Sequence, residues 1–238
     1  MLVAAAVCPC PPLLVPEVAA GAAPELDAAR AACSEALGVL AAARPDRLLV
    51  VGPADESGRG TYPEGTRGSF RGYGVDLAVR LGRGSGEGVA ERELPASLAV
   101  GAWLLARHGW PKTPVEGLGV APQLAPERCA ATGREIGAHP GRTALLVLGD
   151  ASACRTLKAP GYLDERAAPY DAEVARALGA ADLPALMALD AGLARELKAA
   201  GRAPWQVLAG AAEGAGLEGT LLYEDAPYGV GYVVAAWS

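Results

Sequence analysis

The sequence predicts an α/β fold, a single-domain sheet with helices on both faces. Short continuous apolar runs, of which Thr143–Gly149 (TALLVLG) is the clearest, have the length and residue types of buried strands. Segments with apolar residues at helical spacing lie between these runs. No internal repeat and no change of composition divides the 238 residues, so we expect residues 1–238 to form one domain.

The predicted strands are apolar runs that end at proline, glycine or charged residues. Leu2–Cys8 ends at a group of prolines, and Arg47–Gly52 is followed by Pro53. The remaining expected strands are Leu77–Leu81, Thr143–Gly149, Thr220–Glu224 and Val230–Trp237.

The predicted helices begin at residues that favour a first helical turn. Pro24 and Pro95 each open a helix, and Asp182 caps another. The expected helices are 24–40, 95–105, Glu127–Ala138, Ala168–Gly179, Leu183–Ala200 and Pro204–Ala215. Gly58–Gly74 is expected to be a long loop, and Arg83–Gly88 a turn.

Composition excludes several classes of partner. The net charge of −6 and the lack of a basic run argue against nucleic-acid binding. No apolar stretch approaches the roughly 18 residues of a membrane span, so we expect no membrane partner. The five cysteines are odd in number and irregularly spaced, which favours reduced thiols and a cytoplasmic location.

The candidate site follows from topology, because ligands of an open α/β sheet bind beyond the carboxyl ends of its strands. The residues that follow the predicted strands provide two sets of candidates. The candidate catalytic residues, for acid–base chemistry, are Asp55, Glu56, Asp150 and Tyr228. The candidate metal ligands are Cys10 and Cys154. The alternatives are a solvated loop for the acidic pair and buried packing for the cysteines.

The stretch Cys8–Glu17 (CPCPPLLVPE) resembles the opening of class III extradiol ring-cleavage dioxygenases, the LigB-like and Memo-like proteins. That opening usually reads Pro-His-Pro-Pro, an apolar run and Pro-Glu, and its histidine helps to hold a non-haem iron. Tyr223–Tyr232 also resembles the end of Memo-like bacterial relatives. The resemblance implies a LigB-like fold, and it favours a homodimer with a small-molecule ligand in the cleft at the strand ends.

The expected metal ligands of that family are replaced here. Cys10 stands at the first histidine, Ala54 at the second and Ala153 at the third, while Gly201 or a close neighbour lies where the carboxylate ligand is expected. A two-histidine, one-carboxylate triad is what holds Fe(II) in such sites. The only histidines, His108 and His139, lie elsewhere in the sequence and read as surface residues.

The resemblance and its departures together predict a degenerate metal site. We expect a protein that is not a standard Fe(II) catechol dioxygenase, with a binding or accessory role or an altered chemistry. The alternative is a metal-dependent oxygenase that uses Cys10 and acidic residues as ligands. The cofactor is accordingly none, or a divalent metal ion, with zinc or copper favoured by the thiolate and iron by the resemblance.

Overall fold

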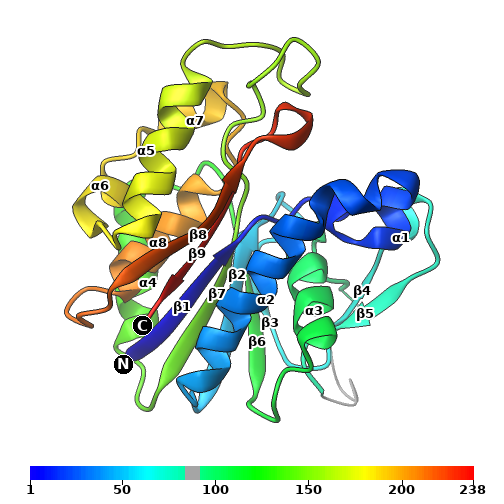
Figure 1. Ribbon diagram of the computed structural model, residues 1–238. Helices are drawn as coiled ribbons and strands as arrows, with labels where there is room; N and C mark the ends of the chain where they lie inside the picture. The colour runs from blue at the N-terminus through cyan, green and yellow to red at the C-terminus, as the bar shows by residue number, and fades with distance from the viewer. Residues whose placement is uncertain (84–91) are drawn as a thin grey trace.

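The computed structural model describes residues 1–83 and 92–238 (Figure 1). Of the turn predicted at Arg83–Gly88, residues 84–88 lie outside the described part of the chain.

A mixed seven-stranded sheet forms the centre of the molecule, with strand order β3-β6-β2-β7-β1-β9-β8. The central strands β6, β2, β7 and β1 run parallel, while β3 and β9 are antiparallel to their neighbours. Two further strands, β4 and β5, pair separately. The bounds are β1 Leu2–Cys8, β2 Arg47–Pro53, β3 Gly60–Tyr62, β4 Arg67–Ser69, β5 Ala78–Arg80, β6 Val115–Val120, β7 Thr143–Leu148, β8 Gly219–Asp225 and β9 Tyr232–Trp237.

Helices cover both faces of the sheet, as predicted (Figure 1). One layer contains α2 (Asp27–Ala42) and α3 (Ala96–His108), and the other contains α4 (Pro126–Gly137), α5 (Ala167–Gly179) and α8 (Arg202–Ala211). The shorter helices are η1 Pro12–Leu14, α1 Pro16–Ala19, η2 Ala20–Leu26, η3 Arg71–Tyr73, α6 Leu183–Met187, α7 Ala191–Glu196 and η4 Pro227–Gly229. Within the described residues, no helix is long and apolar enough to cross a membrane.

Each layer buries two tryptophans. Trp103 and Trp110 belong to the hydrophobic cluster under α2 and α3, whereas Trp205 and Trp237 belong to the cluster under α4, α5 and α8. The Trp237 indole donates a hydrogen bond of 2.7 Å to the Leu178 carbonyl, which ties β9 to α5. The sheet therefore separates two aromatic environments.

Three predictions of local structure were wrong. Gly58–Gly74 is not one loop, because it contains β3, β4 and η3. Leu183–Ala200 is not one helix, because the Asp190 carboxylate accepts a hydrogen bond from the Leu193 amide and starts α7 as a separate helix. The predicted set also lacked β6, whose glycines lower its apolar content; a Cβ on Gly119 would lie 2.1 Å from the Gly58 carbonyl oxygen.

Candidate functional site

The carboxyl ends of the parallel strands meet at one edge of the sheet, which is the upper edge in Figure 1. Cys10 follows β1 there, Ala54 follows β2 and Asp150 follows β7. The turn between β8 and β9 reaches the same edge, because β9 runs antiparallel to β1. The topological argument from the sequence thus brings Cys10, Asp150 and Tyr228 to the same side of the sheet.

Asp150 lies next to Cys10. The Cys10 amide donates a hydrogen bond of 2.9 Å to Oδ1 of Asp150. Burial raises the pKa of Asp150 to about 6, and the single amide donor offsets this only in part. Burial, with the nearby Asp150 charge, also raises the pKa of the Cys10 thiol well above its usual value. A carboxyl group that changes protonation near neutral pH is suited to proton transfer or ligand recognition.

The β8–β9 hairpin carries three tyrosines, of which Tyr232 interacts with this pair. Tyr232 is buried, and its pKa is raised by burial first and then by the charges of Asp150 and Cys10. Burial and Asp225 raise the pKa of Tyr223 to about 12. Tyr228 has a left-handed backbone with φ of 57°, and its hydroxyl donates a 2.8 Å hydrogen bond to Glu25. Such backbone strain in an aromatic residue is typical of functional sites.

The loop that carries Asp150 is fastened to the hairpin and to α5. Main-chain hydrogen bonds join Ala151 to Gly231 and Gly231 to Ser152. The Asp171 carboxylate accepts from the Ser152 amide and hydroxyl, both at 2.8 Å, and from Arg155 at 3.1 Å. Sequence reasoning missed Asp171, although its spacing to Val174 and Leu178 places it on the buried face of α5.

Asp55 and Glu56 lie apart from the Cys10–Asp150 pair. A cavity of about 410 Å³ opens between the segment after β2 and the start of α3, and Ala54, Asp55, Arg92 and Ser97 are among its lining residues. Oδ1 of Asp55 accepts hydrogen bonds of 2.9 Å from the Ser57 hydroxyl and the Gly58 amide, which form a turn. Glu56 is exposed and does not line the cavity.

Cys10 and Cys154 are not brought together. Cys10 packs in the layer of α2 and α3, whereas Cys154 packs in the layer of α4, α5 and α8 and donates to the Leu197 carbonyl at 3.5 Å. Residues 1–83 and 92–238 contain no group of three or more histidine, cysteine, aspartate or glutamate side chains placed to hold a metal ion. The groups that interact with the Cys10 thiol are the Asp150 carboxyl, the Cys8 thiol and the Tyr232 hydroxyl.

Small residues fill the positions that resemble metal-ligand positions. Ala54 is buried, and its side chain packs closely against the main chain at Gly119. A Cβ on Gly119 would lie 3.0 Å from the Ala54 Cβ. A Cβ on Gly201 would lie 2.2 Å from the Trp205 ring. A side chain at position 201 would therefore require Trp205 to move.

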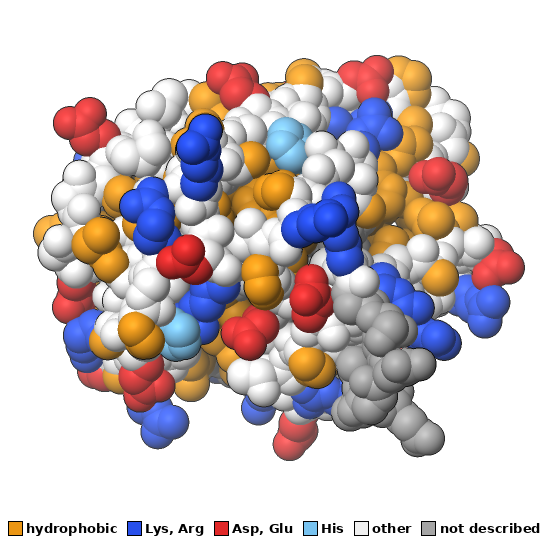
Figure 2. All heavy atoms as spheres, turned by 90° about the horizontal axis from the view of Figure 1, so that it is seen from below, with side chains coloured by type: hydrophobic (Ala, Val, Ile, Leu, Met, Phe, Trp, Pro, Cys, Tyr) orange, Lys and Arg blue, Asp and Glu red, His pale blue; other side chains and the backbone are white. Residues whose placement is uncertain are grey.

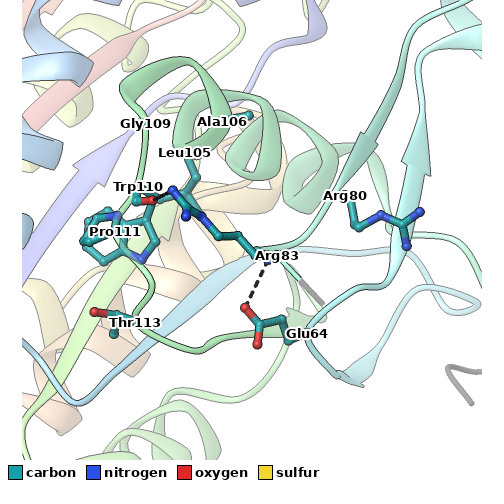
Figure 3. Close-up of a pocket in the computed structure, with 10 residues that line it drawn as sticks. Glu64, Arg80, Arg83, Leu105, Ala106, Gly109, Trp110, Pro111 and Thr113 are labelled. Atoms are coloured by element: carbon teal, nitrogen blue, oxygen red, sulfur yellow. Dashed lines mark hydrogen bonds between the residues drawn. The ribbon is translucent and has the colours of Figure 1, made fainter. Parts of the chain in front are cut away.

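The opposite, amino edge of the sheet carries different features. Figure 2 views the molecule from below and shows histidine side chains on this face. His139 precedes β7, and its carbonyl accepts a hydrogen bond from the Met1 ammonium. A cavity of about 230 Å³ also opens beyond the end of α3, where Arg83 donates from its amide to Glu64 and from its guanidinium to the Trp110 carbonyl (Figure 3). The histidines are thus remote from the Cys10–Asp150 pair.

Comparisons with known proteins show the fold alone. No family model matches the sequence, and no curated protein matches it. The structure is similar to that of the uncharacterized protein JW3007 from Escherichia coli K12, with a TM-score of 0.58 and 14% sequence identity over 99% of each chain. The two proteins therefore share an α/β architecture along their whole length.

Proposed function

We propose that this chain is a LigB-like protein, related to the class III extradiol dioxygenases, that binds a small molecule at the carboxyl edge of its sheet and does not cleave catechols with iron. The resemblance of Cys8–Glu17 and Tyr223–Tyr232 to that family supports the relationship. Both segments lie at the edge where Cys10 meets Asp150, which is where an open α/β sheet binds its ligands.

The observation that carries this proposal is the chemistry of four positions. Cys10, Ala54, Ala153 and Gly201 stand where two-histidine, one-carboxylate coordination would need its donors, and together they provide one thiol. Methyl groups and a hydrogen atom cannot coordinate Fe(II). Trp205 also occupies the space that a carboxylate at position 201 would need.

Asp150 is the main recognition group in this proposal. An ionised carboxylate has about four lone-pair sites, and among the described residues the Cys10 amide is its hydrogen-bond donor. The remaining sites suit a ligand hydroxyl or amine. Tyr232 provides an aromatic ring near Asp150, so the ligand class is a small polar organic molecule.

Oxygen uptake tests the claim about chemistry. The purified protein is reconstituted anaerobically with Fe(II) and mixed with oxygen and either catechol or protocatechuate. We expect uptake equal to that of a protein-free iron control and no yellow ring-opened product. Sustained uptake with a yellow product would overturn the proposal.

Ligand binding tests the role of Asp150. Small hydroxylated and amine-bearing compounds are screened by the shift in melting temperature, and each compound that raises it is repeated with Asp150→Asn. We expect these shifts to shrink in the variant. Shifts that are equal in the two proteins would show that Asp150 does not recognise the ligand.

The alternative function is a metal-dependent oxygenase that uses Cys10 with an acidic residue. The 2.9 Å contact between the Cys10 amide and Asp150 favours it, because it places a carboxylate beside the cysteine. Metal analysis of protein purified without a histidine tag separates the two functions. Stoichiometric zinc or copper that is lost in Cys10→Ser, kept in Cys33→Ser and released as pH falls would favour the alternative.

A further inference from the structure

We propose a second ligand site, independent of the function proposed above, that binds a small α-amino acid. The site is the cavity of about 230 Å³ beyond the end of α3 (Figure 3). Gly109, with φ of 74°, ends α3 there, and Thr113 lines the cavity just before β6 begins. The cavity therefore lies at the amino edge of the sheet, opposite the edge that holds Cys10 and Asp150.

The wall of this cavity contains a buried donor without a partner. Trp110 lines the cavity and is 5% exposed, and its indole N–H has no hydrogen-bond acceptor among the described residues. The indole of Trp237, by contrast, donates to the Leu178 carbonyl at 2.7 Å. An indole N–H can only donate, and leaving it unpaired in the interior costs free energy. A ligand that brings an acceptor atom to Trp110 removes this cost.

Charges of both signs line the same cavity. The Arg83 guanidinium donates to the Trp110 carbonyl at 3.0 Å, and no carboxylate of residues 1–83 and 92–238 forms an ion pair with it. The Glu64 carboxylate accepts from the Arg83 amide at 3.1 Å, and no cation of these residues pairs with Glu64. In Figure 3 the Arg83 guanidinium extends toward Trp110, while Glu64 lies beside the Arg83 main chain. Cationic and anionic groups therefore occupy different parts of the cavity wall.

This arrangement fits a ligand that has a carboxylate and an amine close together. The carboxylate accepts from the Trp110 indole and the Arg83 guanidinium. The ammonium group donates to Glu64, whose charge disfavours a purely anionic ligand such as a phosphate dianion. Leu105 and Pro111 provide apolar wall for an aliphatic side chain. The volume lies below the roughly 300 Å³ at which pockets for drug-sized ligands begin, so the ligand is a small aliphatic α-amino acid.

The indole N–H signal of Trp110 in the NMR spectrum of the ¹⁵N-labelled protein tests the proposal. Trp110→Phe identifies this signal among those of the four tryptophans. In titrations with L-valine, L-leucine and L-methionine we expect a saturable downfield shift, because the N–H gains an acceptor. The valine analogues without the amine or without the carboxylate, 3-methylbutanoate and isobutylamine, should bind at least about tenfold more weakly than valine. No saturable shift with any of the three amino acids, or equal binding of the analogues, would overturn the proposal.

Two substitutions separate the two halves of the recognition, with affinities measured by calorimetric titration. Trp110→Phe keeps an aromatic ring and should weaken the binding of valine and of 3-methylbutanoate by about tenfold. Glu64→Gln should weaken valine by a similar factor without weakening 3-methylbutanoate, because only the amine contacts Glu64. Equal losses for both ligands in Glu64→Gln, or unchanged affinities in Trp110→Phe, would contradict the proposal.

Matched controls show whether the effects belong to this cavity. Trp103→Phe changes a tryptophan of the same helical layer that does not line the cavity, and Glu135→Gln changes an exposed carboxylate of α4. Both should bind valine as the unchanged protein does, and losses equal to those of the cavity variants would overturn the proposal. Thermal unfolding shows whether Trp110→Phe is folded. If it is not, the response of Glu64→Gln to the two ligands decides the question.

Discussion

Two aspartates near the carboxyl edge of the sheet differ in how they are held. Burial raises the pKa of both Asp150 and Asp171. Asp171 accepts three hydrogen bonds, two from Ser152 and one from Arg155, and it is 1% exposed. Asp150 accepts one, from the Cys10 amide, and it is partly exposed. Asp171 is therefore a buried and satisfied carboxylate, whereas Asp150 is partly exposed and keeps open acceptor sites.

The difference assigns different roles to the two carboxylates. Asp171 joins α5 to the loop after β7 and has little capacity left for a ligand. Asp150 is carried by that same loop, and its charge lacks compensation. Asp150 lies at a strand end with acceptor sites left and a raised pKa, so it is the stronger functional candidate of the two.

Asp171→Ala should produce the largest loss of stability. The substitution leaves the Ser152 amide and hydroxyl and the Arg155 guanidinium without their shared acceptor. We expect the free energy of unfolding to fall by about 3 kcal/mol, measured by urea denaturation. Asp171→Asn, which keeps an acceptor for the Ser152 amide, should lose less. A loss below about 1 kcal/mol in the alanine variant would contradict the structural role of Asp171.

Asp150→Asn should raise the free energy of unfolding at high pH, whereas Asp171→Ala lowers it. The folded protein holds the pKa of Asp150 at about 6, above its ordinary 3.8, so folding favours the protonated carboxyl. The contribution of this carboxyl group to folding stability is fully present when the pH is below the ordinary pKa of 3.8. It is lost as the pH rises through about 6. After allowance for partial exposure, the asparagine variant should gain about 2 kcal/mol at pH 8 and little at pH 4.

Unfolding free energies measured across this pH range check that prediction. The wild-type profile should contain a decline near pH 6 that the Asp150→Asn profile lacks. If the two profiles run parallel, Asp150 does not carry the uncompensated charge, and its contrast with Asp171 fails.

Tyr228→Phe should change the free energy of unfolding least of the three substitutions. It removes the exposed hydrogen bond to Glu25, which links the hairpin to η2. We expect a cost of about 0.5 kcal/mol. Glu25→Gln and the double variant complete a cycle in urea unfolding, and their coupling energy should be similarly small. A coupling energy of several kcal/mol would show that this contact stabilises the fold as much as the hydrogen bonds of Asp171 do, which would contradict the prediction.

The fold was more predictable than the site because burial leaves a direct pattern in the sequence. Strand β1 has the predicted bounds, and β2 and β7 differ from prediction by one residue. Buried parallel strands have continuous apolar runs. Strand β6 has no such run, because Gly117 and Gly119 replace side chains where Tyr62 and Gly58 approach closely.

The position of the candidate site could be predicted from the sequence, but several of the residues that form it could not. Cys10 and Asp150 follow directly after parallel strands, and the topology places them together. Cys154 lies further along its loop, which turns toward the other layer. Tyr232 is the first residue of β9 and Asp171 lies inside α5, so a search of the residues that follow strands does not find them. The chemical roles given to Asp55, Glu56, Asp150 and Tyr228 stay predictions.

The placement of the tryptophans provides a natural optical probe of each helical layer. Replacing Trp205 and Trp237 with phenylalanine leaves emission from Trp103 and Trp110 under α2 and α3, and the converse pair of changes leaves emission from the other layer. Coincident denaturation curves from the two variants would mean that both layers melt in one cooperative step. Two separate curves would mean that the sheet divides the chain into halves that unfold independently, and would contradict the prediction of a single domain.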